Sequence, residues 1–195
     1  MIKQVCVYCA SSNHVHENFK IAARNLGKIL AEQNITIKYG GGSAGLMGEV
    51  ADAALSNGGK VIGIIPHFMF DLEWGHKGLT ELHLVDDLHQ RKKMMIQDTD
   101  AVISLPGGTG TFEEMFEAIT LKRLGLYPKP IVILNTNNFY QPLFELLHNC
   151  VTENFLNEKH LEMWSVVEEP AQVIPAINTS PQWPLNAHEF AAVKR

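Results

Sequence analysis

The chain has 195 residues, of which 46% are hydrophobic and 19% are charged. This length suits a single domain with a buried core, and the composition excludes disordered and fibrous proteins. Sixteen Lys and Arg residues against 21 Asp and Glu residues give a formal net charge of −5. The basic surface of nucleic-acid-binding or membrane-surface proteins is therefore missing, and we expect neither partner.

The N-terminal ten residues lack the long apolar region of a signal peptide, and no apolar stretch is long enough to span a bilayer. We therefore expect a cytoplasmic protein. Three cysteines are too few for a disulfide framework. Cys6 and Cys9 form a CxxC pair, but in a strand residues three apart point to opposite faces, so we expect a structural role rather than a zinc or redox site.

Short β-rich runs alternate with longer helical stretches along most of the chain. The expected strands are 2–8, 35–39, 60–65, 101–105 and 130–134, and the expected helices are 18–33, 46–56, 86–97, 111–124 and 140–153. This alternation predicts an α/β fold with a central parallel sheet and helices on both faces. Residues 68–82 show no clear helical or strand-like periodicity of apolar residues, and we interpret them as an irregular surface segment that could cover a site. We expect one domain over 1–195, with the proline-rich segment 168–195 as a loosely packed tail.

Two glycine-rich stretches follow expected strands and precede expected helices: YGGGSAG at 39–45 and PGGTGT at 106–111. In a parallel α/β sheet such turns lie at the carboxyl ends of the strands, where ligands bind. Glycines allow close backbone approach, and the N–H groups at a helix start attract anions. The alternative is a pair of tight turns without a ligand. The two loops together, with the Thr109 and Thr111 hydroxyls, favour a phosphate.

The class of nucleotide can be narrowed by the residues around these loops. Gly40, Gly42 and Gly45 match GxGxxG, but a dinucleotide site also needs an acidic residue after the next strand, and the sequence there is Ile64-Ile65-Pro66-His67. Neither loop has the Gly-Lys-Ser/Thr ending of a P-loop. A mononucleotide therefore fits better than a nicotinamide dinucleotide or an ATP-hydrolysing site.

Glu113 and Glu114 follow the second loop, and Arg91 and Lys92 belong to a basic cluster on the preceding helix. Glu114 is a candidate for chemistry, although two acids at a helix start also complement its dipole. Arg91 or Lys92 could reach a phosphate or ribose, although a basic cluster often forms a solvated face. None of the nine histidines forms a ligand pair such as HExxH, so no metal is expected.

Taken together, GGGSAGLMG at 40–48, HQRK at 89–92 and PGGTGTFEE at 106–114 resemble the LOG (lonely guy) family, whose members carry a PGGxGTxxE motif. The likeness runs from residue 5 to about residue 153. It implies a Rossmann-like phosphoribohydrolase that cleaves the N-glycosidic bond of AMP or cytokinin riboside 5′-monophosphates without a cofactor. An older lysine decarboxylase label would require a pyridoxal phosphate site, and none is visible in the sequence.

The resemblance assigns roles residue by residue. Arg91 and Glu114 would be the catalytic pair. The substrate-binding residues would be Glu73, Lys92, Gly108, Thr109, Gly110, Thr111, Phe112, Glu113 and Thr120, with Gly42, Ser43 and Gly45 as a phosphate-side wall. Ala10, Leu88 and Trp74 depart from the family's usual residues, which puts base specificity in doubt. The family also implies a homodimer or higher homo-oligomer, and a non-catalytic nucleotide-binding module is the rival interpretation.

Overall fold

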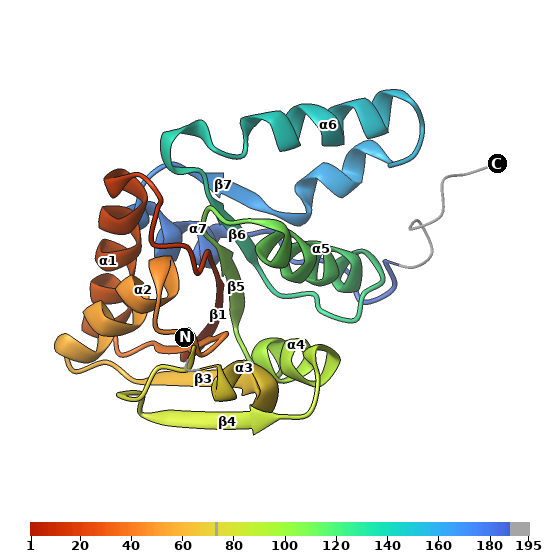
Figure 1. The fold of residues 1–195 in the computed structure, drawn as a ribbon. Helices are drawn as coiled ribbons and strands as arrows, with labels where there is room; N and C mark the ends of the chain where they lie inside the picture. The colour runs from red at the N-terminus through yellow and green to blue at the C-terminus, as the bar shows by residue number, and fades with distance from the viewer. Residues whose placement is uncertain (73, 188–195) are drawn as a thin grey trace.

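The computed structural model describes residues 1–72 and 74–187 and contains a seven-stranded sheet in which every pair of neighbours is parallel. The strand order is β4-β3-β2-β1-β5-β6-β7 (Figure 1). The strands are β1 (Gln4–Tyr8), β2 (Thr36–Tyr39), β3 (Val61–Pro66), β4 (Glu81–Val85), β5 (Ala101–Ser104), β6 (Ile131–Leu134) and β7 (Ser165–Val167). The α-helices are α1 (Glu17–Glu32), α2 (Gly45–Ser56), α3 (His67–Asp71), α4 (Leu88–Ile96), α5 (Thr109–Arg123), α6 (Gln141–Thr152) and α7 (Val173–Thr179). Three 3-10 turns complete the set: η1 (Thr136–Asn138), η2 (Glu158–Met163) and η3 (Pro170–Gln172).

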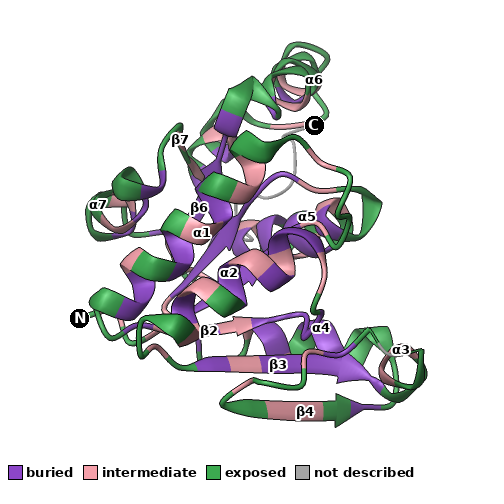
Figure 2. Ribbon diagram, turned by 60° about the vertical axis from the view of Figure 1, so that its left-hand side comes forward, coloured by how far each residue is buried: buried purple, intermediate pink, exposed green. Residues whose placement is uncertain are grey.

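Both faces of the sheet are covered, and a separate apolar core lies on each. Val5 and Val7 of β1 pack with residues of α1, α2 and α7, whereas Cys6 and Tyr8 pack with residues of α4 and α5. Strands β5 and β6 are therefore buried throughout, and β1 is buried from Val5 to Tyr8 (Figure 2). This arrangement confirms the predicted α/β class with helices on both faces, and it explains the continuous apolar runs of β5 and β6.

The two cysteines of the CxxC pair belong to different cores. Cys6 lies in the core beneath α4 and α5, and Cys9 lies in the core beneath α1 and α2. Both thiols are buried, and burial raises their pKa values well above the ordinary value. The prediction that the two side chains point to opposite faces of the sheet is confirmed. Among residues 1–72 and 74–187 no group of three or more His, Cys, Asp or Glu side chains is placed to hold a metal ion.

Two edge strands and a short helix were not predicted. Residues 68–82, expected to be irregular, contain most of α3 and the start of β4. Both β4 and β7 are edge strands with polar or half-exposed residues, so neither has the continuous apolar run of a central strand. The strand prediction therefore covered only the buried centre of the sheet.

The prediction of a loosely packed tail is wrong for residues 168–187. This segment forms η3 and α7, and Val173 and Ile177 enter the core beneath α1 and α2. Trp183 and Ala187 are buried in the opposite core. Apolar side chains spaced along the segment therefore outweigh its proline content. Residues 188–195 lie outside the described part of the chain.

The order of the strands reverses at β1, which has β2 on one side and β5 on the other. The loops that follow these three strands meet at one edge of the sheet: the Ala10 amide donates to the Pro106 carbonyl, and the Met47 amide donates to the Ala10 carbonyl. A crevice at such a switch point is the usual ligand site of an open α/β sheet. No helix in the described residues has the length and apolar character to cross a membrane.

Candidate active site

A cavity of about 540 Å³ opens at this edge, between the loops that follow β1, β2 and β5. Its wall joins both glycine-rich stretches to the α4 helix, which contributes Arg91, and to the start of α5, which contributes Glu114. The lining residues are Cys9, Ala10, Ser11, Ser12, Gly40, Gly42, Ser43, Ala44, Met47, Ile65, Met69, Trp74, Arg91, Gly108, Thr109, Gly110, Thr111 and Glu114. The two glycine-rich loops, which were predicted to lie at one site, therefore share one cavity.

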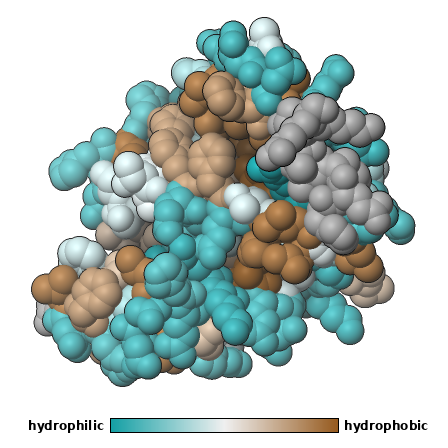
Figure 3. Space-filling view, turned by 90° about the vertical axis from the view of Figure 1, so that its right-hand side faces the viewer, coloured by the Kyte–Doolittle hydropathy of each residue, from teal (hydrophilic) through white to brown (hydrophobic). Residues whose placement is uncertain are grey.

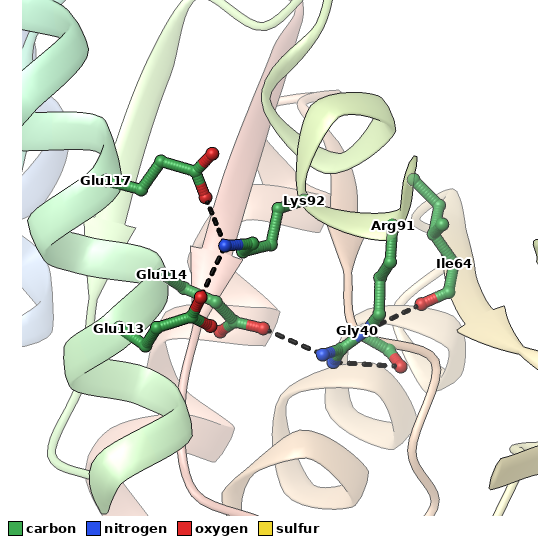
Figure 4. Close-up of polar contacts among 7 residues, drawn as sticks. All are labelled: Gly40, Ile64, Arg91, Lys92, Glu113, Glu114 and Glu117. Carbon is green, nitrogen blue, oxygen red and sulfur yellow. Dashed lines mark hydrogen bonds and ion pairs between the residues drawn. The ribbon is translucent and has the colours of Figure 1, made fainter. Parts of the chain in front are cut away.

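Arg91 and Glu114 form a buried ion pair on the wall of this cavity. The Arg91 Nη1 lies 2.9 Å from the Glu114 Oε1, and the two side chains are only 8% and 4% exposed. Figure 4 shows the guanidinium held from the opposite side by two carbonyl oxygens. Nε donates to Ile64 O at 3.1 Å and Nη2 donates to Gly40 O at 3.4 Å. All three guanidinium nitrogens thus have partners, and the guanidinium in turn orients the carboxylate.

The start of α4 is what places Arg91 at the cavity. The Asp87 side chain accepts a hydrogen bond from the Gln90 amide at 2.8 Å and so caps the N-terminus of this helix. The helix therefore begins at Leu88, and Arg91 lies one turn inside it, facing the sheet. Gly40 makes room for its guanidinium, since a Cβ at that position would lie 2.0 Å from Nη2.

Glu114 has an unusual protonation equilibrium for a carboxyl group. Burial raises its pKa to about 7, although the neighbouring Arg91 opposes this change. Glu113 and Glu117 raise the pKa further through charge repulsion, and Lys92 lowers it. A carboxyl group that titrates near neutral pH is suited to exchanging protons with a substrate or with water.

Lys92 turns away from the cavity and binds two other carboxylates of α5. Its Nζ contacts Glu113 Oε1 and lies 2.8 Å from Glu117 Oε2 (Figure 4). Burial lowers the pKa of Lys92, but the two carboxylates outweigh it and leave the pKa above its ordinary value. These contacts join α4 to α5 next to the Arg91–Glu114 pair. In this structure Lys92 and Glu113 therefore support the site and do not line the cavity.

The start of α5 presents polar groups to the cavity. Gly108 is the N-cap and supplies no side-chain cap, so the N–H groups of the first turn are not bonded to a capping side chain. Thr109 and Gly110 are exposed at this end, and Ser11, Ser12 and Ser43 lie on the same cavity wall. The N–H groups of the first turn, the positive end of the helix dipole and several hydroxyls thus lie together, and groups of this kind attract anions such as phosphate.

The predicted residues separate into three groups. Arg91, Glu114, Gly42, Ser43 and the run 108–111 line the cavity. Lys92, Glu113, Phe112, Thr120 and Gly45 do not line it. Glu73 lies outside the described residues.

Phe112 and Thr120 have other surroundings in this structure. The Phe112 ring lies 6.3 Å from that of Phe139 and 6.1 Å from that of Tyr140, within an aromatic cluster. Thr120 is exposed farther along α5. Neither side chain reaches the cavity in the single chain.

Several lining residues were not predicted from the motifs. Ser11 and Ser12 follow β1 at the point where the strand order reverses, which is a signal that topology alone could have supplied. Met47, Ile65, Met69 and Trp74 form the apolar part of the wall. Their positions depend on how α2 and α3 pack at the sheet edge, and no local pattern in the sequence indicates this.

Gly45 has a structural role at the start of α2. Its φ angle is +60°, and a Cβ there would lie 2.5 Å from both the Ser11 carbonyl carbon and the Ser12 carbonyl oxygen. Its amide donates to the Asn13 Oδ1 at 2.7 Å. Gly45 therefore holds the loop after β1 against the first glycine-rich stretch.

We expect Gly45→Ala to lower the free energy of unfolding by roughly 3 kcal/mol, because the left-handed backbone and the backbone clash both oppose a Cβ. Gly58→Ala is the matched control, since Gly58 has a φ angle of +75° but no atom within 4 Å of the position that a Cβ would take. It should cost only about 1 kcal/mol. Urea denaturation of both variants measures the difference. Equal losses would contradict the role assigned to Gly45.

Comparisons with known proteins agree with these motifs. A protein-family profile described as "possible lysine decarboxylase" matches residues 47–177. A cytokinin riboside 5′-monophosphate phosphoribohydrolase of Rhodococcoides fascians is 44% identical over 155 residues, covering 79% of this chain and 78% of that protein. A probable enzyme of the same name from Oryza sativa subsp. japonica is 39% identical over 181 residues, covering 92% and 74%. One from Arabidopsis thaliana is 41% identical over 155 residues, covering 80% and 72%.

Solved structures with the same fold are more distant in sequence. The molybdenum cofactor carrier protein of Chlamydomonas reinhardtii superimposes with a TM-score of 0.69 at 22% identity, over 91% of this chain and 97% of that one. The molybdenum cofactor binding protein of Rippkaea orientalis gives a TM-score of 0.69 at 20% identity, over 92% and 97%. At these identities the likeness concerns the fold alone.

Proposed function

From the premise that this chain belongs to the LOG (lonely guy) family, we propose that it hydrolyses the N-glycosidic bond of nucleoside 5′-monophosphates. The products are the free base and ribose 5-phosphate. Cytokinin riboside 5′-monophosphates and AMP are the proposed substrates, and the names of relatives at 39 to 44% identity support the former. The observation that carries the proposal is the buried Arg91–Glu114 pair on the wall of a cavity that the start of α5 also lines.

The cavity suggests how such a nucleotide would be oriented. The phosphate would bind the start of α5, where N–H groups and the Thr109 hydroxyl converge with Ser11, Ser12 and Ser43. The ribose would then lie over Arg91 and Glu114 on the same wall. Binding the phosphate far from the reacting bond would hold the sugar in place for reaction.

The chemistry follows from the charge that develops as the base departs. When the C1′–N bond breaks, its electron pair leaves with the base and positive charge develops on the ribose. The Glu114 carboxylate would stabilise that charge and accept a proton from the water that bonds to C1′. The departing base takes up one proton, so the net reaction is hydrolysis. Arg91 would hold the carboxylate and contact the bound nucleotide.

The direct test is to incubate the protein with AMP and with isopentenyladenosine 5′-monophosphate and to separate the products by chromatography. Release of free base together with ribose 5-phosphate is the expected result. Binding of either nucleotide without release of base would favour a non-catalytic nucleotide-binding module instead. Absence of both binding and release would overturn the proposal.

The pH dependence of the reaction gives a second test. Glu114 must be ionised to act as proposed, and its pKa is raised to about 7 by burial. We therefore expect kcat/KM to rise about tenfold per pH unit below this pKa and to level off above it. Rates measured between about pH 5.5 and 8.5 test this expectation. A rate that falls as the pH rises would instead make Glu114 a proton donor.

We also propose that the protein forms a homodimer or a larger homo-oligomer. Figure 3 shows apolar patches between hydrophilic areas on the face at the right of Figure 1, where α4 and α5 lie. Leu88 of α4 and Phe116 of α5 are 44% and 37% exposed. Apolar side chains gathered on one face are typical of association surfaces. Light scattering coupled to size-exclusion chromatography measures the mass in solution.

A further inference from the structure

Tyr140 is a buried tyrosine that contacts the second glycine-rich loop without lining the cavity. It is the N-cap residue of α6 and is only 1% exposed. Its hydroxyl donates to the Leu105 carbonyl oxygen at 2.7 Å, and its oxygen lies 3.1 Å from Ser104 Oγ. Because a phenol carries a single proton, the Ser104 hydroxyl is the donor in the second contact. Burial raises the pKa of Tyr140 to about 12, so this proton is retained at neutral pH.

The carbonyl group that accepts this hydrogen bond lies where the sheet ends and the loop begins. The pairing of β5 with β1 and β6 ends at Ser104, and Pro106-Gly107-Gly108 follows Leu105. The loop then folds tightly onto α5, since a Cβ on Gly107 would lie 2.1 Å from Thr111 Oγ1. The direction of the chain at Leu105 therefore determines where the amides of the first turn of α5 point.

The ring of the same tyrosine contacts the other end of the loop. Its centroid lies 6.1 Å from that of Phe112, with the two rings edge to face. The Phe112 amide donates to the Gly108 carbonyl oxygen at 3.0 Å and so closes the first turn of α5. Edge-to-face aromatic pairs are a favourable geometry. Residues 106–111 thus lie between two points that one side chain contacts.

Tyr140 is itself fixed by the neighbouring strands. Its amide donates to Asn135 Oδ1 at 2.7 Å, and the Asn135 amide donates to the Val167 carbonyl oxygen of β7 at 2.7 Å. Asn135 directly follows β6 and is only 4% exposed. The Phe139 ring also packs edge to face on Tyr140, at 5.0 Å between centroids. A residue whose backbone and ring are both held provides a fixed support for the loop.

We propose that Tyr140 is a positioning residue, which sets the loop 106–111 in the conformation that receives the phosphate of the substrate. It acts through Leu105 and Phe112 and does not touch the nucleotide. Binding groups must be held within about 0.5 Å of their productive geometry, and the glycines of this loop allow many other conformations. This inference rests on the proposed function, in which a sugar phosphate binds at the start of α5, and it adds a residue from outside the cavity.

The test measures the binding of two reaction products, ribose 5-phosphate and adenine, by titration calorimetry, so that no turnover intervenes. Tyr140→Phe keeps the ring and removes only the hydroxyl. The dissociation constant of ribose 5-phosphate should rise about 10-fold, because one lost hydrogen bond and a small displacement of the loop act on that scale. The dissociation constant of adenine should stay that of the wild type, since the loop is expected to bind only the phosphate.

Tyr127→Phe is the matched control. Tyr127 is a tyrosine of the same core, is 8% exposed, and its hydroxyl lies 3.0 Å from Thr99 Oγ1. It does not line the cavity. The variant therefore loses a buried hydroxyl of the same kind at a different place, and both dissociation constants should equal those of the wild type.

Amide hydrogen exchange provides a second measurement on the same proteins. Exchange of the amides of residues 107–112 should be faster in Tyr140→Phe than in the wild type, and unchanged in Tyr127→Phe, because only the first variant loses a support of the loop. Ser104→Ala provides a second variant if Tyr140→Phe folds poorly. It removes the hydroxyl that orients the tyrosine proton, and it should raise the dissociation constant of ribose 5-phosphate by a smaller factor, about 3-fold.

The possible outcomes separate the two proposals. A wild type that releases base from neither nucleotide overturns the proposed function, while the binding of ribose 5-phosphate still tests Tyr140 because it needs no turnover. An unchanged affinity for ribose 5-phosphate in Tyr140→Phe overturns the role of Tyr140 alone. Equal weakening of ribose 5-phosphate and adenine also overturns it, because a merely structural residue would act in this way. The same holds if exchange in the loop is unaltered.

Discussion

Glu114→Gln should reduce the rate of base release from AMP and from isopentenyladenosine 5′-monophosphate by at least ~100-fold, the usual effect of losing a positioned proton acceptor. Glutamine has nearly the same shape as glutamate and can still accept a hydrogen bond from Arg91. Nucleotide binding should therefore persist, and titration calorimetry with AMP measures it directly in the slow variant. Loss of chemistry without loss of binding is the signature of an interaction made chiefly in the transition state.

The environment of Glu114 is the reason for this expectation. Its side chain is 4% exposed and lies 2.9 Å from the Arg91 guanidinium. A negative charge with so little solvent around it acts strongly on a positive charge that develops beside it. Glu117, one turn farther along α5 and 41% exposed, provides the matched control. Glu117→Gln removes the same charge from the same helix and should retain most of the activity. Undiminished turnover in Glu114→Gln would contradict the assignment.

Unfolding experiments separate this chemical effect from a loss of structure. Burial raises the pKa of Glu114 to about 7 in the folded protein, above its ordinary value of 4.5. The folded state therefore binds a proton more tightly than the unfolded state, and the wild type loses stability as the pH rises from about 4.5 through 7. Glu114→Gln has no carboxyl group at this position that can bind or release a proton, so this contribution to the pH dependence of stability is absent from the variant. Relative to the variant, the wild type should lose on the order of 3 kcal/mol over that range. A pH-independent difference would contradict the perturbed carboxyl group.

Sequence reasoning predicted the residues around the second glycine-rich loop better than the apolar residues on the opposite wall of the cavity. The helix start within PGGTGT and the buried strand before it leave clear local signals, because glycines, caps and apolar runs each reflect a local physical requirement. Such signals made Glu114, and either Arg91 or Lys92, candidates, and the family resemblance then paired Arg91 with Glu114. Whether they meet depends on how α4 and α5 pack on the same face of the sheet, and only the structure reports their contact.

The residues that were missed depend on tertiary packing. On α5 the apolar Phe116 is 37% exposed, while the polar Thr111 and Glu114 are buried. The hydrophobic pattern of this helix is weak because part of its inner face serves the cavity and not the core. Trp74 lies in a segment without periodicity, and its place on the wall follows from a bridge between Gly42 and Gly75. No local pattern could have predicted that pairing.

Arg91→Ala should lower kcat/KM by roughly 100- to 1,000-fold, the scale observed when one preorganised charged or donor group is removed from an active site. Both the affinity for the nucleotide and the rate of glycosidic bond cleavage should fall. The guanidinium faces the cavity, and it also holds the Glu114 carboxylate while it donates to Ile64 O and Gly40 O. Lys93→Ala is the matched control, because Lys93 is an exposed cation on the same helix. Its activity should equal that of the wild type.

The kcat/KM of Arg91→Lys should lie between that of Arg91→Ala and that of Lys93→Ala. Lysine keeps the positive charge, but it lacks the planar guanidinium group that can donate hydrogen bonds to a carboxylate and to two carbonyl oxygens at the same time. Steady-state kinetics of the three variants, with AMP and with isopentenyladenosine 5′-monophosphate as substrates, measure the order of their kcat/KM values. A variant that loses thermal stability but keeps its kinetics would mean that Arg91 serves the fold and not the reaction.

The pH profile of Arg91→Ala offers the sharpest test of the pair. Arg91 opposes the rise that burial causes in the pKa of Glu114. Its removal should therefore shift the acidic limb of the residual activity above about pH 7, since the carboxyl group holds its proton more tightly without the cation. The effects of Arg91→Ala and Glu114→Gln should also be less than additive in the double variant, because the two groups touch. Full additivity with an unshifted profile would mean that the two residues act independently, and the proposed coupling of charge and carboxylate would be wrong.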